Sequence, residues 1–366
     1  MSVTINGTNG LTFNDASTQN TAATGFGFKN RIINGAMVID QRNAGAAVTI
    51  NSTANTYVVD RWNGVGQASD GVFTLQQSST APAGFTKSLL ATVTTADSSI
   101  GATQYYLIRQ IIEGYNVADL GFGAAGASTF TLSFWVRSSV TGTFGGAATD
   151  NSALYCYPFS YTISAANTWE QKSITITGPT SGSTFDKTNG GGLNLYFSLG
   201  MGSTYLGTAG AWASATYFSA TGSTNLISTL NATFYITGVQ LEKGSTATSF
   251  DYRPYGTELM LCQRYYQKIG LVDFASVGTG FGISTTQAFF YVKYATTMRA
   301  SPTSSFNSMW LINQTNNYAI TSAGTSYLSA DSAMLRLNVA SGTSAGGPCH
   351  LAPNTTAGFI DFSAEL

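Results

Sequence analysis

The sequence predicts an all-β protein with a large jelly-roll β-sandwich, a smaller C-terminal β domain and a short N-terminal β segment. Stretches in which apolar and polar residues alternate recur along the chain, and this period of two is typical of strands. Gly, Ser, Asn or Pro flank nearly all of these stretches. Only 9% of the residues are charged, while Gly accounts for 40 residues. Many short strands separated by turns favour a sandwich or jelly roll over a parallel α/β sheet.

The chain divides into three predicted regions. Its 366 residues are enough for two domains with proper cores. We expect an N-terminal oligomerisation or attachment segment over 1–28, the sandwich over 29–256 and the C-terminal domain over 257–366. In the first region Val3, Ile5, Leu11 and Phe13 form short alternations separated by Asn-Gly turn signals. So small a segment cannot bury its own apolar face. It therefore docks on the sandwich or winds with copies from other subunits, unless it is a disordered leader.

The predicted strands of the sandwich are residues 71–76, 87–93, 104–112, 128–137, 154–163, 170–177, 193–199 and 233–241. Residues 234–255 are interpreted as the last of these strands and a strap to the C-terminal domain. That domain is expected to open with a helix near Gly256, since Leu259, Cys262 and Tyr266 share one helical face and Thr257 can cap its start. Strands are then predicted over 281–284, 287–296, 304–312, 333–338 and 358–364.

Alternation within residues 129–138 indicates two faces with different roles. Phe130, Leu132, Phe134 and Val136 form a core face, and Thr131, Ser133, Trp135 and Arg137 form the wetter face. Tyr155 and Tyr157 alternate with smaller residues in the next strand, and Tyr196 alternates with Leu195 and Phe197. An aromatic platform beside polar groups is what sugar recognition needs, because a pyranose ring stacks by its apolar face and hydrogen-bonds by its hydroxyls. The alternative is that these aromatic residues pack against the other sheet, the second domain or a neighbouring subunit.

Residues 200–230 form a long Gly-, Ser- and Ala-rich loop, and loops of this size within compact domains are usually functional or mobile. Trp212 lies in it between two alanines, which indicates an exposed contact residue. The candidate glycan-binding residues are therefore Trp135, Arg137, Tyr155, Tyr157, Tyr196 and Trp212.

Enzymatic activity is not expected. A glycosidase needs two carboxylates facing a sugar cleft, and the spacing of Asp150, Glu170, Asp186, Glu242 and Asp251 marks out no pair. The chain has one histidine, His350, and no G-x-S-x-G motif for a serine nucleophile.

No cofactor is predicted. Cys156, Cys262 and Cys349 are too few and too scattered for a disulfide framework or a zinc site, so they are interpreted as buried thiols. Structural calcium bound by loop oxygens remains open, with Asp40, Asp60, Asp70 or Glu242 as ligands.

The charge and hydropathy of the chain also limit its partners. A net charge of −1 gives no electrostatic reason to expect nucleic-acid or anionic membrane binding. No apolar run reaches the length of a membrane span, and the N-terminus lacks the features of a signal peptide. We therefore expect no membrane insertion, and a protein that is made in a cytoplasm and either stays there or leaves by lysis.

Several stretches, in a consistent order, resemble virion proteins of tailed bacteriophages, especially tail-fibre and receptor-binding proteins. They are GLTFNDASTQNTAATGF, NRIINGAMVIDQRN, YVVDRW and GVQLEKGSTATSFDYRPYGTELMLCQRYYQK, within the first 268 residues. The resemblance implies a homotrimeric structural protein on the phage particle, with a jelly roll like those of carbohydrate-binding domains, in contact with other virion proteins. It does not separate a tail location from a capsid one.

Two functional hypotheses follow. In the first, the chain is a tail-fibre or spike subunit that attaches to a host surface glycan by non-covalent binding. In the second, it is a capsid fibre, decoration or tail adaptor protein with a purely structural role, whose aromatic residues serve subunit packing. A depolymerase would be a third class, recognised by the release of reducing ends.

Overall fold

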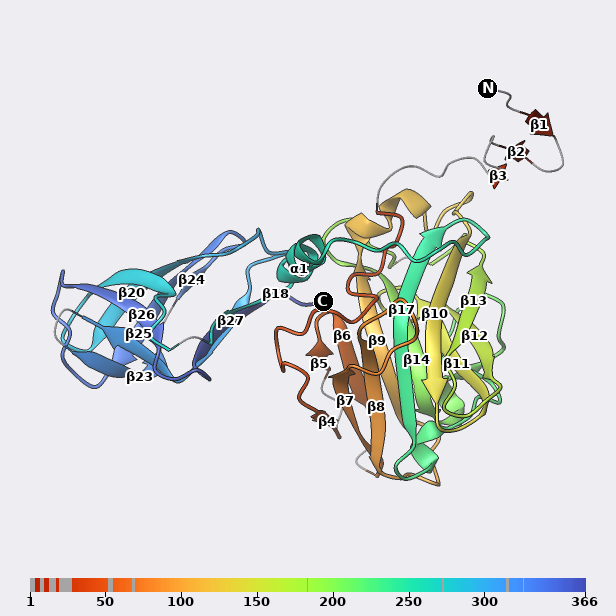
Figure 1. Ribbon diagram of the computed structural model, residues 1–366, viewed down its shortest axis with the longest axis horizontal. Helices are drawn as coiled ribbons and strands as arrows, with labels where there is room; N and C mark the ends of the chain where they lie inside the picture. The colour runs from red at the N-terminus through yellow and green to blue at the C-terminus, as the bar shows by residue number, and fades with distance from the viewer. Residues whose placement is uncertain are drawn as a thin grey trace.

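The computed structural model describes residues 4–6, 10–12, 18–19 and 28–366, apart from 52–54, 68–69, 183, 272, 314–315 and 325. The chain is all-β except for short helices. Figure 1 shows a large sandwich and a smaller β domain on either side of helix α1 (Tyr255–Gln263). In the predicted N-terminal β segment, β1 (Thr4–Asn6), β2 (Gly10–Thr12) and β3 (Thr18–Gln19) pair in that order as an antiparallel sheet.

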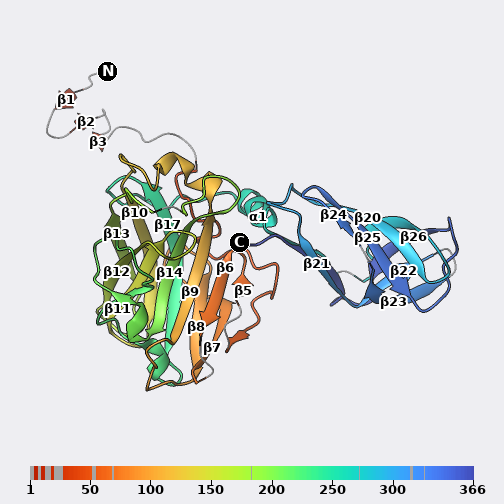
Figure 2. The ribbon, with the colours of Figure 1, turned by 180° about the vertical axis from the view of Figure 1, so that it is seen from behind.

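The sandwich consists of two six-stranded antiparallel sheets, which Figures 1 and 2 show from opposite sides. The first sheet has the order β13 (Glu170–Ile176), β10 (Phe130–Ser138), β17 (Thr233–Lys243), β8 (Ser88–Thr95), β7 (Val72–Ser78), β4 (Val48–Ile50). The second sheet has the order β12 (Cys156–Ile163), β11 (Gly142–Thr149), β14 (Gly191–Met201), β9 (Tyr105–Glu113), β6 (Trp62–Gly66), β5 (Thr56–Val59).

The main core lies between these two sheets. The four apolar residues predicted to face it from β10, Phe130, Leu132, Phe134 and Val136, are fully buried, which confirms the core face. The expectation of a wetter opposite face is wrong for Thr131 and Ser133, which are also buried. Leu195 and Phe197 of β14 meet the core face of β10 from the second sheet, and the rings of Phe134 and Phe197 pack edge to face at 5.1 Å. Each buried Leu or Phe side chain contributes roughly 1.5–3 kcal/mol, so this alternation is the main source of the fold's stability.

The second sheet is covered on both faces. All 11 residues of β14 are buried. Successive side chains of a strand point to opposite faces, so the outer face must also be packed. The loop after β14 folds over this face, where β15 (Leu206–Gly207) pairs in parallel with β16 (Ser219–Ala220) and Phe218 packs on Tyr196. Alternation in the sequence predicts that one face of β14 is exposed to solvent. The loop after β14 covers that face instead.

The C-terminal β domain is built around a closed barrel. Its largest sheet has the order β20-β19-β26-β22-β23-β25-β24, and β20 also pairs with β25, which closes the sheet and removes its free edges. A smaller sheet has the order β18-β27-β21. Their bounds are β18 (Tyr266–Gly270), β19 (Gly278–Gly282), β20 (Gln287–Lys293), β21 (Thr303–Asn307), β22 (Met309–Ile312), β23 (Asn317–Ala323), β24 (Tyr327–Leu328), β25 (Ser332–Val339), β26 (Pro348–Pro353) and β27 (Phe359–Ser363).

Helix α1 is shorter than the sequence predicts. It begins at Tyr255, with Pro254 at the N-cap position and no side-chain cap, so the prediction that Thr257 caps it is wrong. It ends at Gln263, and Tyr266 starts β18 instead of continuing the helical face. The backbone of β18 pairs with β27 along its whole length, and this tertiary pairing overrides the local helical pattern.

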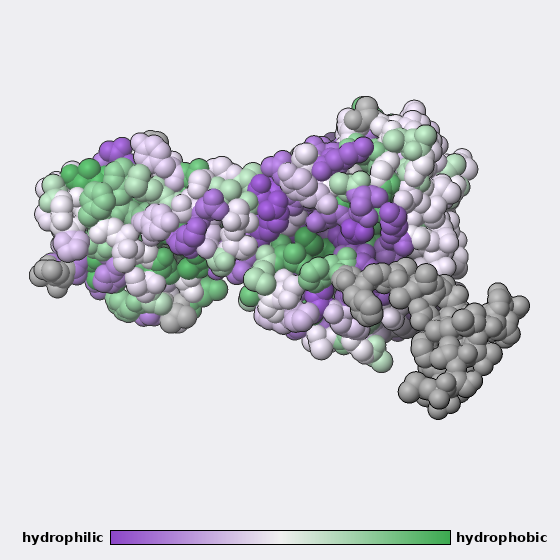
Figure 3. All heavy atoms as spheres, turned by 90° about the horizontal axis from the view of Figure 1, so that it is seen from above, coloured by the Kyte–Doolittle hydropathy of each residue, from purple (hydrophilic) through white to green (hydrophobic). Residues whose placement is uncertain are grey.

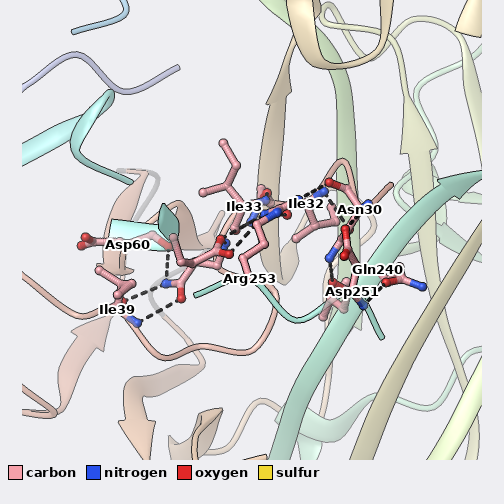
Figure 4. Close-up of polar contacts among 12 residues, drawn as sticks. Asn30, Ile32, Ile33, Ile39, Asp60, Gln240, Asp251 and Arg253 are labelled. Carbon is pink, nitrogen blue, oxygen red and sulfur yellow. Dashed lines mark hydrogen bonds and ion pairs between the residues drawn. The ribbon is translucent and has the colours of Figure 1, made fainter. Parts of the chain in front are cut away.

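A network of buried polar groups ties the strap after β17 to the segment around Asn30 (Figure 4). The backbone N–H of Asn30 donates to Asp251 at 3.2 Å, and Asp251 donates its own N–H to Gln240 at 2.8 Å. Arg253 donates to the carbonyl of Ile32 at 3.1 Å, donates also to that of Asn30, and pairs with Glu258 at 3.2 Å. The sequence stretches that carry the phage resemblance therefore meet here as structural partners.

The chain returns to the sandwich at its C-terminal end (Figure 1). Glu365 pairs with Arg42 at 2.9 Å and also with Arg61, whose side chain is almost fully buried. Tyr57 of β5 donates its hydroxyl to the carbonyl of Leu366 at 2.8 Å. The last residues of the C-terminal domain thus fix that domain to the edge of the second sheet.

We expect Asp60 to give this junction a pH dependence. Burial raises the pKa of Asp60 to about 7, against the weaker lowering effects of Arg42, 3.8 Å away, and of Gln41, while Glu365 and Asp40 add to the rise. The unfolded pKa is about 3.9. The stability contributed by the protonated carboxyl should therefore be complete below about pH 4 and be lost as pH rises to about 7, by a few kcal/mol in all.

Urea unfolding between pH 4.5 and 8 checks this expectation, with Asp60→Asn as the comparison. The amide does not titrate, so the difference in unfolding free energy between the two proteins should change steadily across the window. An identical pH dependence of both proteins would show that Asp60 titrates normally in the folded state.

Candidate functional site

A groove of about 270 Å³ lies on the outer face of the second sheet, between the folded-over loop and the edge where the C-terminus returns. Its lining residues are Asn55, Val65, Tyr105, Leu107, Arg109, Tyr196 and Phe218. Strand register explains this grouping. Asn63 of β6 lies opposite Arg109 of β9, which lies opposite Tyr196 of β14. Directly paired residues point to the same face, so these three side chains form one row across the sheet.

Aromatic rings form one wall of the groove. Phe218, brought in by the loop, contacts the rings of Tyr196 at 4.9 Å, Tyr205 at 5.2 Å and Tyr105 at 5.4 Å. Burial raises the pKa of both Tyr105 and Tyr196, and for Tyr196 the nearby Arg109 partly counters that rise. Both phenols therefore stay protonated at neutral pH and can donate as well as accept hydrogen bonds.

Polar atoms without partners lie on the same face as the groove. The side chain of Asn63 is fully buried, and neither its amide nitrogen nor its oxygen has a hydrogen-bond partner in the described part of the chain. The same holds for Nε of Arg109 and Oγ of Ser198. A buried polar atom left unpaired costs about 1–3 kcal/mol. These atoms are themselves buried, so internal water, and not a ligand in the groove, is the partner that would satisfy them.

Of the six residues predicted from sequence, only Tyr196 lines this groove. Trp135 and Arg137 belong to β10 in the first sheet, whose outer face lies on the opposite side of the sandwich. Arg137 lies over the ring of Tyr235 at 5.0 Å and donates to the carbonyl of Asn167 at 2.9 Å. Trp135 and Arg137 therefore cannot contact the same ligand as Tyr196.

Tyr155, Tyr157 and Trp212 form an aromatic cluster beside the core. Trp212 is half-buried and not exposed as expected, since its ring stacks on Tyr155 at 5.3 Å and its Nε1 donates to the carbonyl of Thr177 at 2.6 Å. Tyr157 is only 7% exposed and belongs to the main core. All three side chains pack in or against the main core. Such packing is the alternative to sugar recognition that was stated for the aromatic residues.

Sequence reasoning missed Tyr105, Arg109 and Phe218. The alternation of Tyr105, Leu107 and Arg109 within a predicted strand was a usable signal for one shared face. No sequence signal indicated the position of Phe218, because a loop, and not a strand, brings this residue to the groove.

The carboxylates considered for catalysis or calcium are held by local partners. Asp150 accepts hydrogen bonds from Leu154 and Thr184, Glu170 pairs with Lys172, and Asp186 accepts from Thr188. Asp40 accepts from the backbone of Asn43 and Gly45, Asp70 from Gln104, and Glu242 from Thr248. Within the described residues, no three His, Cys, Asp or Glu side chains gather as a metal site.

A second aromatic surface lies on the exterior of the barrel. Phe281, Phe289, Tyr291 and Met334 line a groove of about 310 Å³ there, and Figure 3 shows apolar atoms mixed with polar ones on this domain. Nearby Arg336 already donates to Gln287 at 2.8 Å. The barrel groove has aromatic rings, but none of the described residues that line it is charged, whereas Arg109 lines the groove on the sandwich, which is therefore the stronger candidate.

No protein-family model and no curated protein matches the chain. Similar solved structures include the enzymatically active domain of tailspike protein 4 of bacteriophage CBA120, with 13% identity, a TM-score of 0.32, and 59% of this chain and 22% of that chain covered. The family 11 carbohydrate-binding module of a Clostridium thermocellum cellulase has 10% identity, a TM-score of 0.27, and coverage of 56% and 99%. The CBM22-1 xylan-binding domain from Paenibacillus barcinonensis has 10% identity, a TM-score of 0.24, and coverage of 56% and 99%. The match spans less than a quarter of the tailspike domain, and similarities this low carry no argument about function.

In the part of the chain that the structure describes, no helix is both long and apolar enough to span a membrane.

Proposed function

We propose that this chain binds a glycan non-covalently in the groove lined by Tyr105, Arg109, Tyr196 and Phe218. The observation that carries the proposal is the combination of an aromatic wall with the amide of Asn55 and the guanidinium of Arg109 in one groove lining. A sugar ring matches both, because its C–H face stacks on aromatic rings while its hydroxyls pair with amide and guanidinium groups. A groove of about 270 Å³ is near the lower end of small-molecule sites and suits a short stretch of a glycan.

The proposal includes a biological setting. We propose that the chain is a structural subunit of a phage tail fibre or spike, located on the virion, and that the glycan lies on the host surface. The sequence resemblance to phage virion proteins supports this setting. A homotrimer with other virion proteins as partners, joined through the N-terminal segment, belongs to the same proposal.

Binding without catalysis is also part of the proposal. None of the residues that line the groove is Asp or Glu, whereas glycoside hydrolysis normally needs two carboxylates across the scissile bond. The five carboxylates considered from sequence lie outside the lining, which supports a binding role for the groove.

Replacing Tyr105 by alanine is expected to weaken glycan binding about tenfold, since one aromatic contact contributes roughly 0.5–1.5 kcal/mol beyond its buried area. A glycan array identifies ligands of the unaltered protein, and calorimetry then measures the affinity of the variant. Trp135→Ala is the matched control, because Trp135 is also half-buried but belongs to the first sheet. Unchanged affinity of the Tyr105 variant, or no glycan bound by the unaltered protein, would favour the purely structural alternative.

A further inference from the structure

Arg109 differs from every other arginine of the chain in its partners. The sequence contains nine arginines, all within the described residues. Five pair with a carboxylate: Arg31, Arg42, Arg61, Arg253 and Arg264. Arg137 and Arg299 donate to backbone carbonyls, and Arg336 donates to Gln287. Arg109 has neither a carboxylate nor a backbone carbonyl as partner in the described structure. Its polar neighbours are neutral: Asn63, Tyr57, Tyr105 and Tyr196.

The surroundings of Arg109 leave its charge uncompensated. It lies in the middle of the row across the second sheet, flanked by Asn63 and Tyr196, and its guanidinium carbon is 5.9 Å from the ring centroid of Tyr196. No Asp or Glu among the described residues lines the groove. The acidic residue at the nearby sheet edge, Glu365, is already paired with Arg42 and Arg61. A half-buried cation with no anion beside it is an unusual arrangement in a chain with so few charges.

We propose that the groove selects acidic glycans, and that Arg109 binds the carboxylate or sulfate group of the sugar. This inference rests on the proposed glycan-binding function of the same groove. Arg109 lines the groove, and its two Nη atoms can donate two parallel hydrogen bonds to an anion of two or more oxygens.

A neutral glycan would fill the groove without supplying a counter-charge for Arg109. It would stack on the aromatic wall equally well, but it would cover Arg109 while offering only hydroxyls to it. An anion adds direct Coulombic attraction to the guanidinium, which a neutral hydroxyl lacks. The acidic form of a given glycan should therefore bind about tenfold more tightly, or better, than its neutral counterpart.

The test uses the full chain and an array on which each hexuronate or sialyl glycan is printed beside its carboxyl-reduced form, and each sulfated glycan beside its desulfated form. We expect the acidic member of at least one pair to bind more than tenfold more tightly. The carboxylate and sulfate arms show which anion is recognised. Arg109→Gln should remove the preference, bringing the two members of the pair within about twofold of each other, while Arg109→Lys should keep part of it.

Controls separate this inference from the proposed function. Arg137→Gln removes an arginine from the opposite outer face and should leave the preference unchanged. Arg109→Gln breaks no ion pair in the described structure, so its melting temperature should match that of the unaltered protein and exclude misfolding as the cause. Equal binding of acidic and neutral members, or a preference that survives Arg109→Gln, would overturn the inference while the glycan-binding function stands. Binding of no glycan at all would overturn both.

Discussion

Replacing Trp62 by alanine is expected to lower the free energy of unfolding by about 3–5 kcal/mol, the usual loss when a large buried aromatic residue is truncated. Trp62 is fully buried in the main core, where its ring lies 6.3 Å from that of Phe197. Its Nε1 also donates to the carbonyl of Asn34 at 3.1 Å. The substitution would therefore leave both a cavity and a buried carbonyl oxygen without that donor, and the two losses add.

Urea unfolding followed by circular dichroism measures this loss. Trp135→Ala is the matched comparison, because it removes the same side chain from a half-buried position on an outer face and should cost clearly less. Equal losses for the two variants would contradict the assignment of Trp62 to the centre of the core.

Arg253→Ala should have an effect of similar size, about 3–5 kcal/mol, for an electrostatic reason. The side chain of Arg253 is 4% exposed and that of its partner Glu258 is 10% exposed. Removing the cation leaves a buried carboxylate without its counter-charge and takes a donor away from the carbonyls of Asn30 and Ile32. The same measurement of urea unfolding applies.

Two further variants identify the cause of this loss. Arg253→Met combined with Glu258→Gln removes both charges, and we expect it to be less destabilising than Arg253→Ala alone, because no isolated charge stays buried. Arg31→Ala breaks a pair in which Asp119 is 49% exposed, and should cost less than about 1 kcal/mol. A double variant as unstable as the single one would show that the lost hydrogen bonds, and not the uncompensated charge, dominate.

The fold class could be predicted from the sequence because it depends on local alternation. The inward face of β10 and most strands of the sandwich follow from period-two patterns that burial confirms. Strand β11, which reads GTFGGAAT, was missed, since its glycines and alanines carry little apolar signal. The single strand predicted over 304–312 is divided into β21 and β22 at Ser308, which has a φ of 48°. A turn at a non-glycine residue leaves no clear mark in the sequence.

The groove could not be predicted, because it depends on contacts between distant segments. Tyr196 was identified by alternation, but the residues around it come from β6, β9 and the loop after β14. Which of the many aromatic residues is buried depends on where that loop folds. Trp212 packs on Tyr155 and Phe218 packs on Tyr196, although both lie in the same Ala- and Ser-rich stretch.

The stretches that resemble phage virion proteins have a structural explanation. Asn30 and Asn34 near the start of the sandwich meet Arg253 and Glu258 near its end, over more than 200 residues of sequence. These contacts join the first and last segments of the sandwich. We therefore expect the same residue pattern in other proteins whose sandwich is joined in this way. The ligand-binding residues proposed for the groove, Tyr105, Arg109, Tyr196 and Phe218, lie outside those stretches.

The central claim is that the outer face of the second sheet holds the glycan. A crystal structure of the protein soaked with the tightest ligand found on the array tests it most directly. The account predicts a sugar ring in contact with Tyr105 and Phe218, with a polar group of the glycan within hydrogen-bond distance of Arg109. A glycan seated instead on the face that carries Trp135, or on the exterior of the barrel with the groove empty, would contradict it.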